Sequence, residues 1–367
     1  MPIREMMVFC TLFDSNYLDR GLALYWSMRK HISVFKLYIC AFDSACFKIL
    51  SDMELENVVL LSVEDIMTSL LKEKQKERSR AEFCWTCTPL VIEYVLLKYG
   101  EKACTYIDAD IYFFSSPLCI VQEVIDSGCS VGLVIHRFER NSEYGGRIFS
   151  VGKYCIQFNT FLNDEAGIRV LSDWKQNCLE WCYARYEDGK FGDQKYPDKW
   201  RQKYSGVHES QNTGAGVAPW NLHLYSYYRR DRENIWLQYQ GVPFQLIFYH
   251  FEGFKYLSNG KMYLNIWRPS ERGMSRKIHI LYGEYLKVMA LVRNYLTEEY
   301  GVTFEQMYAD ESVLVGKSQS LKRFWNEEGL IDGGKKWAAY WTNNICFAKC
   351  LMKGNGIICF CKKKSKK

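Results

Sequence analysis

Two carboxylates inside an otherwise apolar run constrain this chain more than any other feature of its sequence. Residues 103–114 are largely apolar or aromatic, and Asp108 and Asp110 interrupt them. An unpaired charge is costly to bury, so both side chains need a partner or a place where a strand ends at solvent. Two residues apart in an extended chain, the carboxylates point the same way. They suit a hard cation, Mg²⁺ or Mn²⁺, that bridges a diphosphate, and the alternative is two aspartates that simply close a strand.

Short apolar runs alternate with helical patterns on both sides of this segment. Such alternation predicts an α/β protein with a parallel sheet and crossover helices. The expected strands are residues 8–12, 35–42, 58–61, 130–135, 154–161 and 243–251, and the expected helices are residues 18–31, 84–99, 170–186 and those from about 282 onward. Pro89 is expected in the first turn of its helix, where a missing N–H costs little.

Composition and charge exclude several classes of protein. The 367 residues are 48% hydrophobic and 25% charged, which is ordinary for a globular chain. Residues 362–367 supply five of the net +6 charges, so the rest is close to neutral and nucleic-acid binding is not indicated. The 15 cysteines lie in apolar segments without a visible signal peptide or membrane-spanning stretch, which predicts free thiols and a cytoplasmic location.

The C-terminal region leaves two alternatives open. Residues 346–360 are apolar and a lysine-rich tail follows, which is typical either of peripheral contact with the inner face of the cell membrane or of a packed helix with a disordered tail. The spacing of Cys346, Cys350, Cys359 and Cys361 matches no familiar zinc site, so a buried helix is favoured there.

Several segments, taken in their order along the chain, resemble the GT-A-fold glycosyltransferases and in particular glycosyltransferase family eight, the class of glycogenin and bacterial lipopolysaccharide hexosyltransferases. The run around Asp108 and Asp110 resembles the Asp-x-Asp signature of that fold. The resemblance spans roughly residues 5–285, and the order of the motifs is more specific than any one of them. The further matching segments are residues 9–18 (first strand and loop), 24–31 (the helix behind it), 192–196 (Asp-Gln segment), 214–221 (strand and loop) and 249–255 (His-x-x-Gly element).

The resemblance implies a fold and a set of residue roles. The fold would be a Rossmann-like, mixed, mainly parallel sheet flanked by helices, with a catalytic domain over residues 1–280, a helical C-terminal appendage over 281–353 and a basic tail over 354–367. The implied ligands of Mn²⁺ or Mg²⁺ are Asp108, Asp110 and His250. The implied donor-binding residues are Thr11, Phe13 and Tyr17 around the base, with Asp108, Asn159 and Lys255 on the diphosphate and sugar, and the implied catalytic residues are Asp193 and Gln194.

Besides lacking, in residues 159–161, the glycine that is common in close relatives, this chain departs from the family pattern at two further places. Lys255 lies five residues after His250, where the family lysine lies six after and before Pro-Trp. The family often has an arginine that opens the helix before the Asp-x-Asp, whereas here Arg78 and Arg80 lie upstream of residues 84–89. Both departures concern residues that would contact the donor.

The expected activity is metal-dependent transfer of a hexose or N-acetylhexosamine from a UDP-sugar to a hydroxyl acceptor, with retention of configuration. The acceptor would be a saccharide, a lipid-linked saccharide or a protein. One alternative is a non-catalytic nucleotide-sugar or glycan-binding protein on the same fold. Another is a sugar nucleotidyltransferase, which would need a Gly-rich phosphate loop where residues 13–17 have none.

Overall fold

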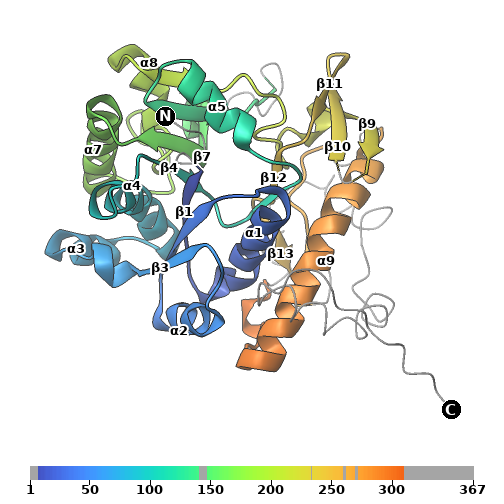
Figure 1. Ribbon diagram of the computed structural model, residues 1–367, viewed down its shortest axis with the longest axis horizontal. Coiled ribbons are helices and arrows are strands. Elements are labelled where there is room, and N and C mark those ends of the chain that lie inside the picture. The colour runs from blue at the N-terminus through green and yellow to red at the C-terminus, as the bar shows by residue number, and fades with distance from the viewer. Residues whose placement is uncertain (1–6, 140–146, 233, 259–261, 269–271, 310–367) are drawn as a thin grey trace.

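A seven-stranded sheet forms the centre of the molecule in the computed structural model, which describes residues 7–139, 147–232, 234–258, 262–268 and 272–309 (Figure 1). The strand order is β3-β2-β1-β4-β7-β6-β8, and within this sheet β7 alone runs against its neighbours. The predicted α/β class and the mixed, mainly parallel sheet are therefore confirmed. The strands are β1 (Val8–Phe13), β2 (Lys36–Ala41), β3 (Val58–Ser62), β4 (Ala103–Ile107), β6 (Val131–Ile135), β7 (Tyr154–Leu162) and β8 (Val207–Glu209).

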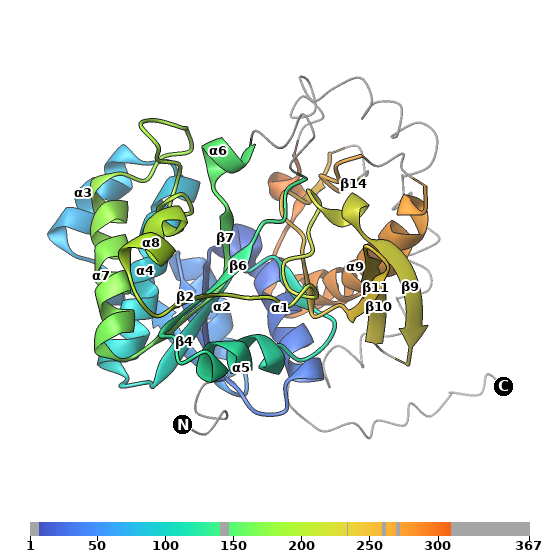
Figure 2. The same ribbon diagram turned by 90° about the horizontal axis from the view of Figure 1, so that it is seen from above.

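Helices cover both faces of this sheet (Figures 1 and 2). Alternate residues of β1 enter two different cores, because successive side chains of a strand point to opposite faces: Phe9 packs with α1, and Cys10 packs with α4. One face carries α3 (Ser69–Glu77), α4 (Arg80–Lys98), α7 (Glu165–Glu180) and α8 (Trp200–Lys203), and the other carries α1 (Leu18–His31), α2 (Ser44–Met53) and α5 (Leu118–Asp126).

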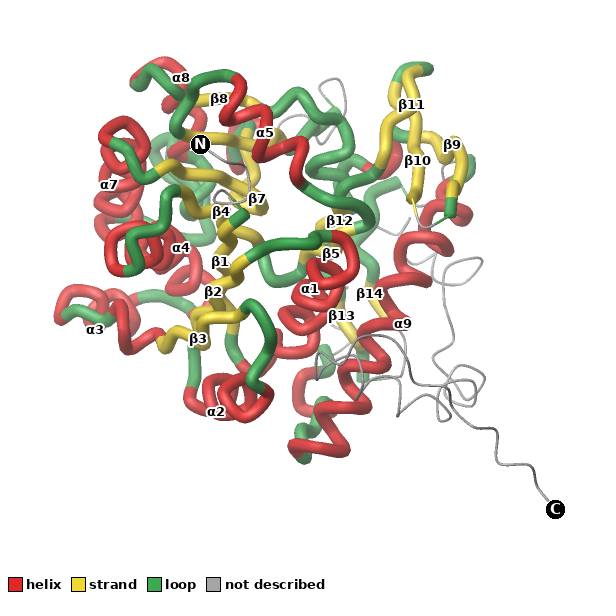
Figure 3. The backbone as a smooth tube through the Cα atoms, viewed as in Figure 1, coloured by secondary structure: helices red, strands yellow, loops and turns green. Residues whose placement is uncertain are grey.

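A smaller region lies beside α1 and is built around the long helix α9 (Met274–Tyr300), which packs against α1. Figure 3 shows its short strands grouped near that helix. These are the antiparallel sheet of β9 (Ser226–Asp231), β10 (Asn234–Tyr239) and β11 (Val242–Gln245), the pair β5 (Ile111–Phe113) with β12 (Phe248–His250), and the pair β13 (Lys255–Tyr256) with β14 (Met262–Tyr263). The remaining short helices are α6 (Arg147–Val151) and single 3-10 turns at Ser15–Tyr17, Val63–Ile66, Tyr196–Lys199, Leu222–Leu224 and Glu305–Met307.

Three predicted helices have wrong boundaries. The helix expected over residues 170–186 is α7, which begins at Glu165 after the capping residue Asp164 and ends at Glu180. The helix expected from residue 84 begins at Arg80, because Ser79 and Glu82 form a reciprocal capping box, so Pro89 lies in the helix interior. The C-terminal helix begins at Met274 rather than near 282, after Gly273 in a left-handed conformation. The helical appendage is thus confirmed as far as α9, which spans the expected boundary at residue 280, while the basic tail and the four C-terminal cysteines lie outside the described residues.

The cysteines of the described chain are free thiols, as the sequence predicts, and most of them are buried. Among the same residues, no helix combines the length and the apolar character needed to cross a membrane.

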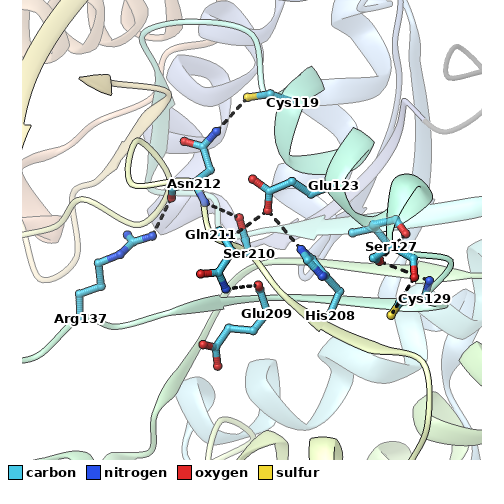
Figure 4. Close-up of polar contacts among 11 residues, drawn as sticks. Cys119, Glu123, Ser127, Cys129, Arg137, His208, Glu209, Ser210, Gln211 and Asn212 are labelled. Carbon is cyan, nitrogen blue, oxygen red and sulfur yellow. Dashed lines mark hydrogen bonds and ion pairs between the residues drawn. The ribbon is translucent and has the colours of Figure 1, made fainter. Parts of the chain in front are cut away.

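The segment that follows β8 is held in place by polar contacts with Glu123 of α5 and with Arg137 (Figure 4). Glu123 of α5 accepts a hydrogen bond from the Gln211 amide at 3.0 Å and lies 3.3 Å from His208 Nε2. The Arg137 guanidinium donates to the carbonyls of Asn212 and Ala215. The segment then runs beside β12, where the carbonyl of Gly214 accepts from the Ile247 amide at 3.0 Å. These contacts fix the strand that carries His250.

Substituting Gly214 tests this close approach. A Cβ at residue 214 would collide with the carbonyl oxygen of Gln245, so Gly214→Ala should lower the free energy of unfolding by about 1–3 kcal/mol. Gly283→Ala in α9 is the matched control, because nothing lies within 4 Å of its Cβ and alanine favours a helix by up to ~1 kcal/mol. Urea denaturation measures both variants, and a Gly214→Ala protein as stable as wild type would contradict the packing described.

Candidate metal and donor site

The two aspartates converge through a tight turn at the end of β4. The amide of Ile111 donates to the Asp108 carbonyl at 3.2 Å, and Ala109 between the aspartates is buried. The chain is therefore not extended here, and the expectation that the pleat of a strand aligns the two side chains is wrong. A turn allows both carboxylates to approach one point from the end of the sheet.

His250 reaches the same point from a distant part of the chain. β12 pairs antiparallel with β5, which sets His250 opposite Ile111, and the amide of Phe251 donates to the Asp110 carbonyl at 2.9 Å. His250 Nε2 lies 3.0 Å from Asp110 Oδ1 and 3.7 Å from Asp108 Oδ2. One ligand atom from each of the three residues falls within 4.8 Å of the others.

Two neighbouring side chains orient this triad. Gln157 Oε1 accepts from His250 Nδ1 at 2.9 Å, which leaves Nε2 directed at the carboxylates. The Tyr106 hydroxyl donates to Asp108 Oδ1 at 3.0 Å. Partners of this kind fix ring orientation and ligand basicity in metal sites. Gln157 belongs to no motif of the family, and its spacing of two from Asn159 on a strand is the sequence signal that places both on one face.

Burial and mutual charge shift the pKa of every member of the triad. Burial raises the pKa of Asp108 to about 7, although the charge of His250 acts in the opposite direction. Burial also acts to raise the pKa of Asp110, but the charge and the hydrogen bond of His250 hold it below its ordinary value. Burial acts to lower the pKa of His250, but the charge and hydrogen bond of Asp110 raise it well above the ordinary value.

The donor set of the triad fits a divalent cation. Two carboxylates and one imidazole nitrogen suit Mn²⁺ and also accept Mg²⁺, and Ca²⁺ favours a larger set of oxygen ligands. The side chains of Asp108 and Asp110 remain 28% and 13% exposed, so the site opens to one side, where substrate oxygens can approach.

A polar pair lies beside the triad on the α4 side of the sheet. Asn159 is opposite Tyr106 in the β4–β7 register and is fully buried, yet neither of its amide atoms has a partner among the described residues. Asp193 is 5% exposed, and the indole of Trp174 donates to its carbonyl at 3.0 Å. Burial, followed by the charges of Cys182 and Asp108, raises the pKa of Asp193 well above its usual range. Asp193 thus lies near enough to Asp108 for their charges to interact, and Asn159 lies opposite Tyr106, whose hydroxyl is bonded to Asp108.

The remaining predicted donor-binding residues differ in exposure, and Tyr17 lies near the triad, because burial, followed by the charge of Asp110, raises the pKa of its phenol. Thr11 is buried, and the Phe13 ring packs in the core against the place where Gly21 lacks a side chain. Tyr17 is 41% exposed with the Arg20 guanidinium over its ring. Gln194 is half-buried, and Lys255 is exposed on β13.

The two upstream arginines have different roles. Arg78 is buried and donates to the carbonyls of Cys178 and Leu179 at the end of α7, so it is structural. Arg80 is exposed in the first turn of α4 and pairs with Asp14 and with Asp43 at the carboxyl ends of β1 and β2. Arg80, not Arg78, lies where it can approach a ligand at that edge of the sheet.

Replacing one carboxylate tests the metal site. Asp110→Asn should weaken Mn²⁺ binding by about 10- to 100-fold or more, since even the loss of an outer partner costs that much in known sites. Calorimetric titration measures the affinity, with Asp173→Asn on the exposed face of α7 as the control. Equal weakening in both variants would argue against a cation at the triad.

Metal affinity should also rise with pH. The pKa of His250 is raised and that of Asp108 is about 7, so both groups hold protons that a cation must displace. We expect tighter Mn²⁺ binding at about pH 8 than at about pH 6, with protons released on binding. Titrations in buffers of different ionisation enthalpy measure that release, and a constant affinity without it would show that these groups are not ligands.

Comparison with solved structures gives weak global similarity. A galactosyltransferase, LgtC, solved with donor and acceptor sugar analogues, has a TM-score of 0.48 and 12% identity over 77% of this chain and 95% of its own. Mouse xyloside xylosyltransferase 1 has a TM-score of 0.42 and 11% identity over 67% of this chain and 97% of its own. No family model matches the chain.

Curated sequences give a closer relationship. The uncharacterized protein YfnD of Bacillus subtilis is 27% identical over 250 residues, which are 67% of this chain and 77% of YfnD. The uncharacterized protein YfnF of the same organism is 30% identical over 257 residues, which are 68% of this chain and 82% of YfnF. The chain belongs to the family of YfnF.

Proposed function

We propose that this protein is a glycosyltransferase that uses a divalent cation and transfers a hexose or N-acetylhexosamine from a UDP-sugar to a hydroxyl acceptor, with retention of configuration. The convergence of Asp108, Asp110 and His250 at the edge of the sheet carries the proposal. Ligands of open α/β sheets bind at the carboxyl ends of the strands, which is where this triad lies. A bound Mn²⁺ or Mg²⁺ would neutralise the charge that develops on a departing diphosphate.

The buried amide of Asn159 supports the proposal that the donor sugar binds beside the triad. A buried amide without partners costs free energy in a folded protein, and a ligand hydroxyl that pairs with it recovers that cost. Its register position opposite Tyr106 directs it toward the same side as Asp108. Sugar hydroxyls both donate and accept, so they match both atoms of the amide.

The proposed reaction exchanges one bond at the anomeric carbon for another. The bond from that carbon to the diphosphate oxygen breaks with its electron pair, and a bond to the acceptor oxygen forms. The acceptor proton leaves to the departing phosphate or to a nearby base. Asp193, buried beside Asp108 with a raised pKa, is the side chain we assign to that region, as a base or an acceptor anchor, with Gln194 next to it.

In this reaction the protein would mainly position the donor and the acceptor and stabilise the developing charge electrostatically. The rigid elements that meet at the triad suit that demand, because β4, β5, β7 and β12 each contribute or orient a group. A non-catalytic nucleotide-sugar-binding protein would share these contacts but would not release UDP. A sugar nucleotidyltransferase would instead form a diphosphate from a nucleoside triphosphate.

UDP release from a panel of UDP-hexoses with Mn²⁺ tests the proposal. Wild type should release UDP from at least one donor, and Asp110→Asn should lose that release. Donor binding without release would favour the non-catalytic alternative, and the absence of both would refute the proposed donor class.

Asn159→Ala separates a ligand-binding amide from a structural one. We expect kcat/KM for the donor to fall by about 10- to 100-fold, because a substrate hydrogen bond is lost. Thermal stability should stay equal or rise, because the substitution removes a buried amide that has no partner among the described residues. A loss of stability together with unchanged kinetics would show that Asn159 is structural.

A further inference from the structure

An arginine in the first turn of α1 lies beside the metal triad. Arg20 Nη2 donates to the carbonyl of Phe254 at 3.1 Å. The Phe254 amide donates in turn to the Phe251 carbonyl at 3.1 Å, and the Phe251 amide donates to the Asp110 carbonyl at 2.9 Å. One short turn of backbone therefore joins the guanidinium of Arg20 to an aspartate of the triad.

Electrostatic interactions show the same proximity. Burial acts to lower the pKa of Arg20, but charges that include those of Asp19 and Asp110 raise it. Burial acts to raise the pKa of Asp110, whereas the charges of His250 and then of Arg20 lower it. The positive charge of Arg20 thus acts on the place where the cation is proposed to bind.

The guanidinium keeps donors for a further ligand. Nη1 donates to the Asn16 carbonyl at 3.4 Å and to Asp19 Oδ1 at 3.0 Å, while Nη2 donates to Phe254. Nε and the second hydrogen of Nη2 have no hydrogen-bond partner among the described residues, and the side chain of Arg20 is 12% exposed. Because Arg293 lies 3.8 Å from the other oxygen of Asp19, two guanidinium groups share one carboxylate and a net positive charge remains.

Aromatic contacts hold the guanidinium in one orientation. Arg20 Cζ lies 4.6 Å from the ring centroid of Tyr17 and 5.9 Å from that of Phe254. A group that is already ordered loses less entropy when it binds an anion. Lys255, which the resemblance assigns to the diphosphate, is exposed on β13, and its ammonium makes no hydrogen bond or ion pair with the part of the chain that the structure describes.

We propose that Arg20 binds the diphosphate of the nucleotide donor, the role that the resemblance gives to Lys255. A divalent cation at the triad neutralises only part of the charge of a nucleoside diphosphate. A planar guanidinium with open N–H groups suits the phosphate oxygens that remain. The proposal rests on the proposed function, because it requires a diphosphate on the open side of the triad.

Calorimetric titration with UDP and with inorganic diphosphate, each with Mg²⁺, tests this role. Arg20→Gln should weaken the binding of both ligands by about 10- to 100-fold, because hydrogen bonds between charged groups are lost. Arg20→Lys should recover only part of the affinity, since an ammonium returns the charge without the planar fork. Lys255→Gln should weaken binding less than Arg20→Gln does. Arg29→Gln is the matched control, because it removes a charge from the same helix where Arg29 pairs with Glu56.

Cation binding without an anion distinguishes a ligand-binding arginine from a structural one. Arg20→Gln removes a positive charge that acts on Asp110, so the variant should bind Mn²⁺ alone at least as tightly as wild type. A variant whose site had collapsed would instead lose affinity for Mn²⁺ and for diphosphate together. We therefore expect opposite effects on the two ligands.

The outcomes separate this proposal from the proposed function. If wild type binds UDP and Arg20→Gln binds it equally well, loses Mn²⁺ binding too, or is less affected than Lys255→Gln, then Arg20 does not bind the diphosphate and the glycosyltransferase proposal stands. If Arg20→Gln loses diphosphate binding alone, but wild type hydrolyses no UDP-sugar, the diphosphate site is supported and the catalytic proposal is refuted. A wild type that binds neither ligand in the presence of the cation would refute both.

Discussion

The antiparallel pairing of β5 with β12 is the constraint on which the rest of the site depends. β5 follows the Asp108–Asp110 turn directly, and β12 ends in His250, so the register that places His250 opposite Ile111 decides whether the three side chains meet. A shift of one residue would turn His250 to the opposite face. The neighbouring segment, tied through Arg137 and through the close approach at Gly214, holds β12 in that register. Distant polar contacts thereby set the geometry of the triad.

The site also concentrates interactions that a fold optimised for stability alone would avoid. His250 and Asp110 form a buried ion pair, the amide of Asn159 is without a partner among the described residues, and Asp193 is a buried carboxyl beside Asp108. Buried charges and unpaired polar groups are costly, and such clusters mark functional sites more often than structural ones. The apolar packing of α1, α4 and α7 on the two faces of the sheet stabilises the fold and offsets the cost of these buried charges and unpaired polar groups.

Sequence patterns predicted the parts of the molecule that depend on local periodicity. The early strands and α1 follow from apolar runs along the chain, whereas the three residues of the triad were named together only through the resemblance to glycosyltransferase family eight. The predictions that were wrong concern residues whose positions depend on contacts that the local apolar pattern does not reveal. The capping box at Ser79 outweighed the tendency of Pro89 to lie in a first turn, and the packing of Phe13 against Gly21 followed from helix α1 crossing behind the strand.

Anomalous diffraction at the manganese edge, from crystals grown with UDP and Mn²⁺, shows whether the triad of Asp108, Asp110 and His250 binds the cation. We expect a single strong anomalous peak bounded by Asp108, Asp110 and His250, at metal–ligand distances of roughly 2.0–2.3 Å, with the diphosphate of UDP on its open side. Bound UDP without a peak at these residues, or a peak at another part of the molecule, would contradict it.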